Sequence, residues 1–125
     1  MTMPHTAESA TPATTASVPT DRPARYGKQL TAHLGRRHGG EWDAEAGTGW
    51  VQLADARLEL TAADTALDLR VLTPDGATGE DLARLEDVVG RHLVRFATHD
   101  SLEVAWRRAD GTPGTRQVTE PTEPA

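Results

Sequence analysis

This 125-residue sequence contains no cysteine. Without cysteine the chain can form no disulfide, no thiolate metal site and no cysteine nucleophile. It also lacks the run of about 18 apolar residues that a membrane-spanning helix requires, and its N-terminus does not show the basic and then apolar pattern of a signal peptide. We therefore expect a soluble, cytoplasmic protein that does not enter a membrane.

Positive charge and aromatic residues are also scarce. Lys and Arg number 13 against 19 Asp and Glu, which gives a net charge of -6 at pH 7. Nucleic-acid-binding proteins usually carry a basic patch or stripe, and none is visible here, so we expect no binding to nucleic acid. The few aromatic residues alternate as core residues do within the predicted helices and strands, and we expect most of them to pack inside: Tyr26, Trp42, Trp50, Phe96 and Trp106.

The two ends of the chain differ in composition from the middle. Residues 1–16 are mostly Ala, Thr, Pro, Ser and Met, and the stretch from Asp110 onwards is rich in Pro, Thr, Gly and Glu. Such segments bury too little apolar surface to offset the entropy that the chain loses on folding. We expect a disordered N-terminal tail at residues 1–12, one folded domain at residues 13–109 and a disordered C-terminal tail at residues 110–125.

The strongest helix signal lies at residues 78–96. Thr78 and Asp81 have the spacing of a capping box, and the acidic first turn complements the helix dipole. Apolar residues then recur at spacings of three and four, the period of one helix face, and a histidine interrupts them. This stripe, which we expect to face a core, consists of Leu82, Leu85, Val89, His92 and Phe96, widened by Val88 and Leu93.

A second helix is predicted earlier in the chain. Asp21 can act as its N-cap, and Pro23 is tolerated in its opening turn. Gly35 and the Gly39-Gly40 pair end it. The residues expected on its inward face are Tyr26, Leu30, His33 and Leu34.

The remaining segments alternate apolar and polar residues with the period of a β-strand. One precedes the first helix, four lie between the helices and one follows the second helix. Each has one apolar face, as in an antiparallel sheet covered on one side only, so both helices should pack on that side. This predicts a two-layer α+β domain with the order β-α-β-β-β-β-α-β, compatible with a TATA-binding-protein-like arrangement. The side chains expected on the uncovered face are Arg57, Glu59, Thr61, Asp68, Arg70, Glu103 and Arg107.

Three separated blocks of the sequence resemble a bacterial family, the domain-of-unknown-function family 2218. They are TDRPARYGKQLTAHL at residues 20–34, LEDVVGRHLVRFA at residues 85–97 and LEVAW at residues 102–106. The family has no established activity. Its members are often encoded beside siderophore-interacting reductases, so the resemblance implies a link to iron or siderophore utilisation, with such a reductase as a partner.

His33 and His92 are each expected on the inward stripe of a helix, and the two helices should be neighbours. In one interpretation the imidazoles approach each other or a carboxylate and form a metal or ligand site, which would suit iron or zinc. In the other, each is a partly buried histidine whose ring nitrogens bond to the backbone or to Tyr26. A metal site needs three or four convergent ligands, and two histidines alone do not supply them.

A second cluster surrounds His38, which precedes the Gly39-Gly40 pair. His38 and the nearby carboxylates would complete a ligand site begun by His33. Alternatively, the neighbouring arginines only occupy a helix C-terminus, where cations are favoured, and the carboxylates form the solvated face of an edge strand. The charged residues concerned are Arg36, Arg37, Glu41, Asp43 and Glu45.

These features predict a non-catalytic binding or accessory protein with a small-ligand or metal site between the helices and the sheet. The candidate ligand-binding residues are His33, His92, Tyr26 and His38, with His33 and His92 as metal ligands. One alternative is a small hydrolase or isomerase that uses His and a carboxylate; another is a protein-interaction module that dimerises through a sheet edge. We expect a monomer or homodimer. The triad residue types at residues 99–101 are expected to form a turn, because adjacency in sequence is not triad geometry.

Overall fold

The structure of this protein is a computed structural model, and it describes residues 12–96 and 101–119. The described residues form two helices and seven strands in the order β1 (Thr14–Pro19), α2 (Pro23–His38), β2 (Gly40–Asp43), β3 (Thr48–Leu53), β4 (Ala56–Ala62), β5 (Ala66–Leu72), α3 (Gly79–Phe96), β6 (Glu103–Arg108) and β7 (Pro113–Val118). The predicted order of the first eight elements is confirmed, and an unpredicted strand, β7, follows them. Residues 1–11 of the predicted N-terminal tail, and His99 and Asp100 of the predicted turn, lie outside the described residues.

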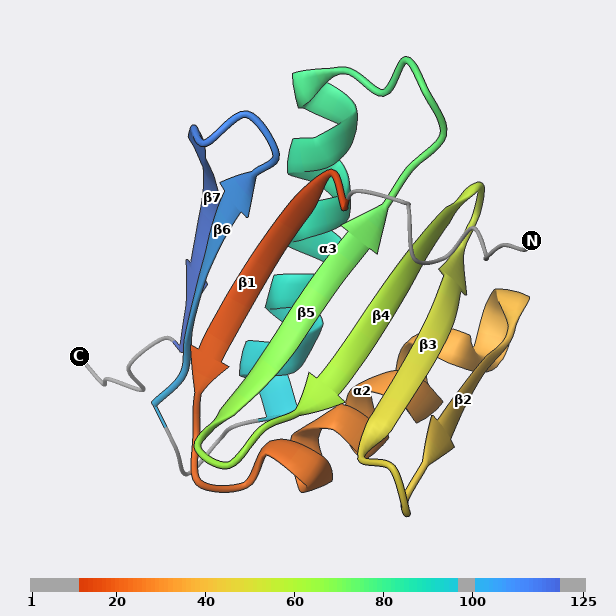
Figure 1. The fold of residues 1–125 in the computed structure, drawn as a ribbon, viewed down its shortest axis with the longest axis vertical. Helices are drawn as coiled ribbons and strands as arrows, with labels where there is room; N and C mark the ends of the chain where they lie inside the picture. Colours follow the sequence, from red (N-terminus) through yellow and green to blue (C-terminus); the bar gives the residue numbers. More distant parts are fainter. Residues whose placement is uncertain (1–11, 97–100, 120–125) are drawn as a thin grey trace, which may run out of the picture.

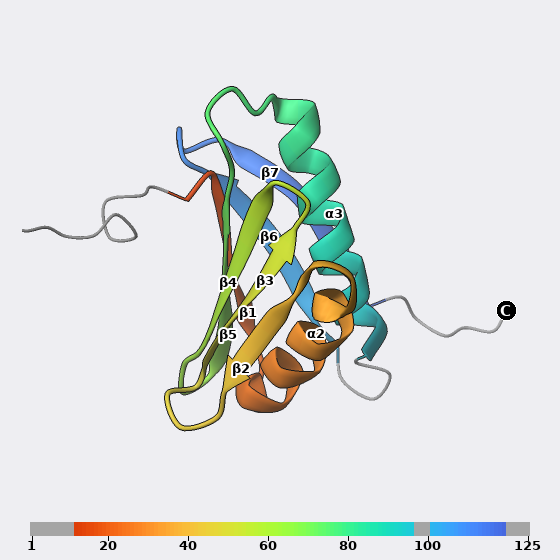
Figure 2. The same ribbon diagram turned by 90° about the vertical axis from the view of Figure 1, so that its right-hand side faces the viewer.

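All the strands join one antiparallel sheet with the order β2-β3-β4-β5-β1-β6-β7. Figure 1 shows this sheet face on, and the turned view of Figure 2 shows both helices on the same side of it. Helix α2 packs over β2, β3 and β4, and α3 packs over β6 and β7. The predicted two-layer α+β architecture is therefore confirmed. Within the described residues, neither helix is long and apolar enough to cross a bilayer.

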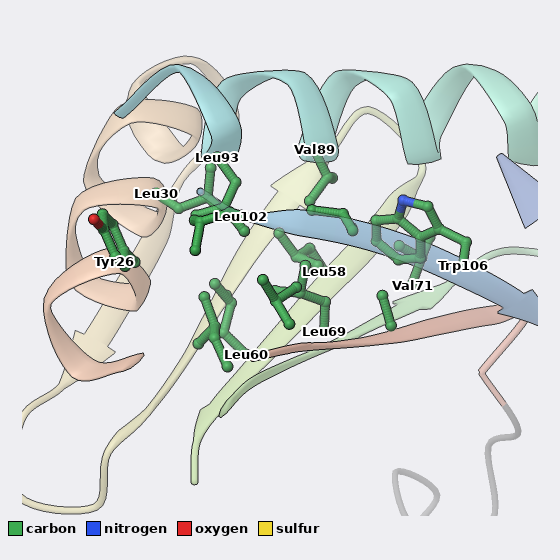
Figure 3. Close-up of a cluster of buried hydrophobic side chains, with 14 of the residues drawn as sticks. Tyr26, Leu30, Leu58, Leu60, Leu69, Val71, Val89, Leu93, Leu102 and Trp106 are labelled. Atoms are coloured by element: carbon green, nitrogen blue, oxygen red, sulfur yellow. The ribbon is translucent and has the colours of Figure 1, made fainter. Parts of the chain in front are cut away.

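The hydrophobic core lies between the sheet and the helices. Figure 3 shows Leu30 of α2 and Val89 and Leu93 of α3 pointing towards the apolar side chains of the strands. Each such side chain, when fully buried, contributes about 1.5–3 kcal/mol relative to exposure. The fully buried strand residues that they meet include Val18, Val51, Leu58, Leu67, Leu69, Val71 and Val104.

The opposite face of the sheet is uncovered and charged, as predicted. In β4, Leu58 and Leu60 are buried, and successive side chains of a strand alternate between faces, so Arg57, Glu59 and Thr61 point outwards. Glu59 forms ion pairs with Arg57 at 3.4 Å and with Arg70 at 3.9 Å. The register of the neighbouring strands places the other predicted residues on the same face, namely Asp68, Arg70, Glu103 and Arg107.

Trp50 is the exception among the aromatic residues, because the prediction that it packs in the core is wrong. Its neighbour Val51 is fully buried, so Trp50 faces outwards, with the guanidinium carbon of Arg57 lying 4.9 Å from its ring centroid. Trp42 and Trp106 do pack against the core. Two adjacent apolar residues in a strand leave it undecided which of them faces inwards, and here the register with β4 decides.

Strand β7 lies within residues 110–125, and the prediction of disorder is wrong for Pro113–Val118. The strand pairs antiparallel with β6, and α3 packs over it. The side chain that it buries most completely is polar: Gln117 is 6% exposed, and its Oε1 accepts a hydrogen bond of 2.8 Å from Nε1 of Trp106. Because this buried residue is not apolar, composition alone did not reveal the strand.

Helix α3 begins as predicted. The Thr78 hydroxyl accepts a hydrogen bond of 3.1 Å from the backbone N–H of Asp81, and the Asp81 carboxylate accepts one of 2.9 Å from the backbone N–H of Thr78. This reciprocal pair is a capping box, which satisfies two donors that the first turn would otherwise leave free.

The buried face of α3 is rotated from the predicted stripe, and β7 is the cause. Glu86, Val89, Gly90 and Leu93 are buried, whereas Val88 is 36% exposed. A Cβ at Gly90 would collide with the Gln117 side chain of β7, and one at Gly114 of β7 would collide with the Glu86 carboxylate. The helix therefore approaches β7 through a glycine and a carboxylate rather than through the leucines of the predicted stripe.

The start of α2 differs from the prediction in one respect. Arg22 occupies the N-cap position without a side-chain cap hydrogen bond, so the assignment of Asp21 as the cap is wrong, whereas Pro23 does open the helix. Further along, a Cβ at Gly27 would lie only 2.7 Å from the ring of Trp42. This glycine lets the indole of β2 pack directly against the helix backbone.

Candidate functional site

His33 of α2 and His92 of α3 lie next to each other where the two helices meet. Their ring centroids are 4.9 Å apart and their planes are inclined by 41°, and Phe96 contacts His33 edge-on at 5.5 Å between centroids. Arg36 and Arg95 follow the two histidines by three residues each, which places each arginine beside its histidine on the helix surface. We call His33, Arg36, His92 and Arg95 the helix seam.

The helix seam faces solvent, so the predicted location between the helices and the sheet is wrong. His33 is exposed and His92 is half-buried, whereas Leu30 and Leu93, each adjacent on its helix, are fully buried. The two apolar residues fill the space where the helices meet. The imidazoles consequently lie above this apolar contact and remain accessible.

The ring of His92 is held in one orientation by its own helix. Its Nδ1 lies 2.6 Å from the backbone oxygen of Val88. A carbonyl oxygen only accepts hydrogen bonds, so Nδ1 is the donor, and in the neutral ring Nε2 then carries the free lone pair. The predicted alternative, a histidine whose ring nitrogen bonds to the backbone, therefore holds for Nδ1 of His92. The same type of bond commonly orients histidines that bind a metal through their other ring nitrogen.

The surroundings of His33 favour its neutral form. Partial desolvation at the helix contact lowers the pKa of His33, and the charges of His92, Arg36 and Arg95 lower it further. The imidazole therefore offers a lone pair at neutral pH rather than a positive charge. The same electrostatics make the seam favourable for a negatively charged group.

The other two candidate residues do not join the histidine pair. Tyr26 is 5% exposed and belongs to the hydrophobic core beneath α2. His38 is the last residue of α2 and is exposed. In the part of the chain that the structure describes, no three His, Asp or Glu side chains converge as a metal site would require, so His33 and His92 offer a pair of donors rather than a complete set.

A second polar cluster, which the sequence analysis missed, surrounds Glu86 beneath α3. The Glu86 side chain is completely buried. Its carboxylate accepts hydrogen bonds from Nε and a terminal nitrogen of Arg108 at 3.1 Å each, from the Thr14 hydroxyl at 2.8 Å, and from the backbone N–H and hydroxyl of Thr115 at 2.9 Å each. We call Glu86, Arg108, Thr14 and Thr115 the Glu86 network; it connects α3 with β1, β6 and β7.

The electrostatics of the network show that Glu86 is ionised. Burial alone raises the pKa of Glu86, but the hydrogen bonds from Arg108, Thr115 and Thr14 together outweigh it, so the pKa lies below its ordinary value. The carboxylate also raises the pKa of Arg108. Both oxygens of Glu86 are engaged by protein donors, which makes it a structural residue and a poor general base for the hydrolase or isomerase alternative.

No simple sequence signal identifies this cluster. Glu86 stands next to Asp87, whose carboxylate is exposed and pairs with Arg91 at 3.3 Å, so both residues read as the charged face of a helix. The partners Thr14, Arg108 and Thr115 come from three strands that are distant in sequence. The glycine at position 114, which leaves room for the carboxylate, is the one hint that the sequence contains.

Comparisons with known proteins agree with this fold. A family model described as an uncharacterised protein conserved in bacteria matches residues 15–107. The NMR structure of PA4090 from Pseudomonas aeruginosa is similar to this chain with a TM-score of 0.60 and 31% sequence identity, over 78% of this chain and 96% of that one. No curated protein matches the sequence. The family model spans most of the chain, so the protein belongs to the bacterial domain-of-unknown-function family 2218.

Proposed function

We propose that this protein is a non-catalytic binding protein and that its ligand is a metal ion carried in an anionic chelate, held at the helix seam. The observation that carries the proposal is the approach of His33 and His92 to 4.9 Å between ring centroids, with the His92 ring oriented by the Val88 carbonyl. Two imidazoles from separate helices therefore lie close together on an accessible surface, and one of them is held in a fixed orientation.

The number of protein donors points to a ligand that brings donors of its own. Zinc takes four ligands and octahedral metals take more, and the described residues supply only the two imidazoles at this place. A metal ion that is already bound by a small chelator has few open coordination positions left. Two neighbouring imidazoles would fill them.

The charges of the seam favour an anionic complex over a bare cation. Arg36 and Arg95 disfavour the protonated form of His33, and for the same Coulombic reason they disfavour a free metal cation there. A lone pair attracts a metal, whereas a guanidinium attracts negative charge. Only a metal with anionic co-ligands satisfies the histidines and the arginines together.

Iron is one metal that fits this description. Imidazole is a suitable ligand for iron, zinc, copper and nickel, and an iron complex with an anionic siderophore-type chelator would present the required charge. This extends the link to iron or siderophore utilisation, with a siderophore-related reductase as partner, that the family resemblance implies.

Calorimetric titration with two chelates of the same metal tests the proposal. Ferric nitrilotriacetate leaves two coordination positions open, whereas the ferric complex of the hexadentate chelator ethylenediaminetetraacetate leaves at most one, too few for both imidazoles. We expect binding of the first and not of the second, and a loss of more than about tenfold in affinity in a His33→Ala/His92→Ala variant.

His38→Ala is the matched control, because His38 is an exposed histidine of the same helix. It should leave the affinity unchanged. Equal binding by the wild type and the His33→Ala/His92→Ala variant would show that the seam is not the site.

A further inference from the structure

The uncovered face of the sheet carries a concavity of about 680 Å³ over β2, β3 and β4. Its outward lining side chains belong to the face of the sheet opposite the two helices, which Figure 2 shows together on one side, so the concavity is separate from the helix seam. The outward side chains that line it are mainly Glu41, Asp43, Trp50, Arg57, Glu59 and Thr61.

Trp50 is the unusual member of this surface. The register places it in one row between Glu41 of β2 and Glu59 of β4, on a face that is otherwise polar. Unlike Trp42 and Trp106, it does not belong to the core cluster. An indole that contributes nothing to the core but lines a concavity is well suited to contact a ligand.

The charges around Trp50 favour a cation. The guanidinium carbon of Arg57 already lies 4.9 Å from the ring centroid, which shows that the indole accepts a cation at this distance. Glu59 is engaged by Arg57 at 3.4 Å. Within the described part of the chain, neither Glu41 nor Asp43 forms an ion pair. Asp43 Oδ1 accepts hydrogen bonds from the backbone N–H groups of Glu45 and Ala46 at 3.0 and 3.2 Å, so Glu41 offers the carboxylate that is available to a positively charged partner.

We propose that this concavity binds an extended basic segment of another protein, with an Arg or Lys side chain that reaches over Glu41 towards Trp50. Strand β2 is one edge of the sheet, and an extended peptide can add to such an edge as a further strand. Its alternate side chains would then point to the outer face, in the same row as Glu41 and Trp50. The open shape of the concavity suits a polypeptide that enters from the edge.

Binding of a capped peptide of alternating Arg and Thr tests the proposal. The peptide should shift the Trp50 indole N–H resonance in ¹⁵N-labelled protein, and a peptide with citrulline in place of Arg should not. Trp50→Leu keeps an apolar side chain but removes the aromatic face, and Glu41→Gln removes one charge. We expect each to weaken binding about tenfold, measured by calorimetric titration because Trp50→Leu lacks the indole signal.

Glu103→Gln is the matched control, because Glu103 is an outward carboxylate at the other end of the sheet, paired with Arg116 at 2.6 Å. It should change the affinity less than about twofold. Equal weakening by Glu103→Gln would show unspecific attraction to an acidic protein and would overturn the proposal. Spermidine binding as tightly as the peptide, with the same dependence on Glu41, would also overturn it by assigning the concavity to a small organic cation.

Discussion

Helix α3 carries two polar clusters whose surroundings differ sharply. Glu86 is completely buried and both its oxygens are occupied by donors from Arg108, Thr14 and Thr115. His92 is half-buried, and the hydrogen bond found for its ring runs from Nδ1 to the Val88 carbonyl. The first cluster uses its bonding capacity to hold the fold together, whereas the second keeps a ring nitrogen available to a ligand.

This comparison gives a criterion for separating structural from functional polar residues in a protein of unknown activity. A buried charge must be paired and hydrogen-bonded to be tolerated, so complete satisfaction by the protein indicates a structural role. An oriented but accessible donor has no such requirement. The criterion predicts that the two clusters respond in opposite ways to substitution.

The largest effect is expected when Glu86 is removed. Glu86→Ala leaves Arg108 and the Thr115 N–H without their partner in a part-buried environment, and breaking a buried ion pair costs about 3–5 kcal/mol. We expect the free energy of unfolding to fall by about 3 kcal/mol. This value is at the lower end of the range because the Arg108 side chain is 20% exposed and water can hydrate it once Glu86 is gone. Urea unfolding measures it.

Asp87→Ala is the control for that substitution. Asp87 is adjacent to Glu86 in sequence, but its carboxylate pairs with Arg91 on the exposed side of the helix. Such a pair contributes about 0.5 kcal/mol or less. Similar losses in the two variants would contradict the distinction between the clusters.

An intermediate effect is expected from acid. The pKa of Glu86 is depressed below its ordinary value of 4.5, so its stabilisation is fully present above pH 4.5 and is lost as the pH falls through the depressed pKa. The difference in the free energy of unfolding between wild type and Glu86→Gln should therefore be constant near neutral pH and shrink in acid. Urea unfolding at a series of pH values checks this, and a difference that persists unchanged in strong acid would show that the charge of Glu86 is not responsible.

The smallest effect on stability is expected at the helix seam. His33→Ala/His92→Ala removes side chains that are exposed or half-buried, and substitutions at such positions usually change the free energy of unfolding by about 0.5 kcal/mol or less. Thermal unfolding without ligand should be nearly unchanged, although the proposed chelate binding is lost. A large destabilisation would assign the histidines to the fold and remove the contrast with Glu86.

Local patterns predicted a large part of this structure correctly. The capping box at Thr78 and Asp81 fixed the start of α3, and strict alternation identified the outward residues of β4 and β5. These features depend on neighbours within a turn or a strand, so the sequence contains the necessary information. The resemblance to the family also rested on local blocks, and the family model confirms it.

The errors arose where distant segments decide the outcome. Composition classed Pro113–Val118 as a tail, because the strand buries Gln117 instead of an apolar residue. Without β7, the stripe of α3 is predicted to centre on Val89 and His92, whereas packing of the helix against β7 turns Glu86 and Gly90 inwards. One unpredicted strand therefore accounts for the hidden carboxylate and contributes to the misplaced histidine.

The sequence by itself determined the order of the first eight elements, the two-layer class and the candidate pair His33 and His92, because periodicity and turn residues act over short distances. Only the tertiary structure decided that the pair faces solvent, that Trp50 points outwards and that Glu86 is buried. Those outcomes depend on which surfaces meet across the sheet and the helix layer. They follow from packing and from the pairing of buried charge, which no local pattern records.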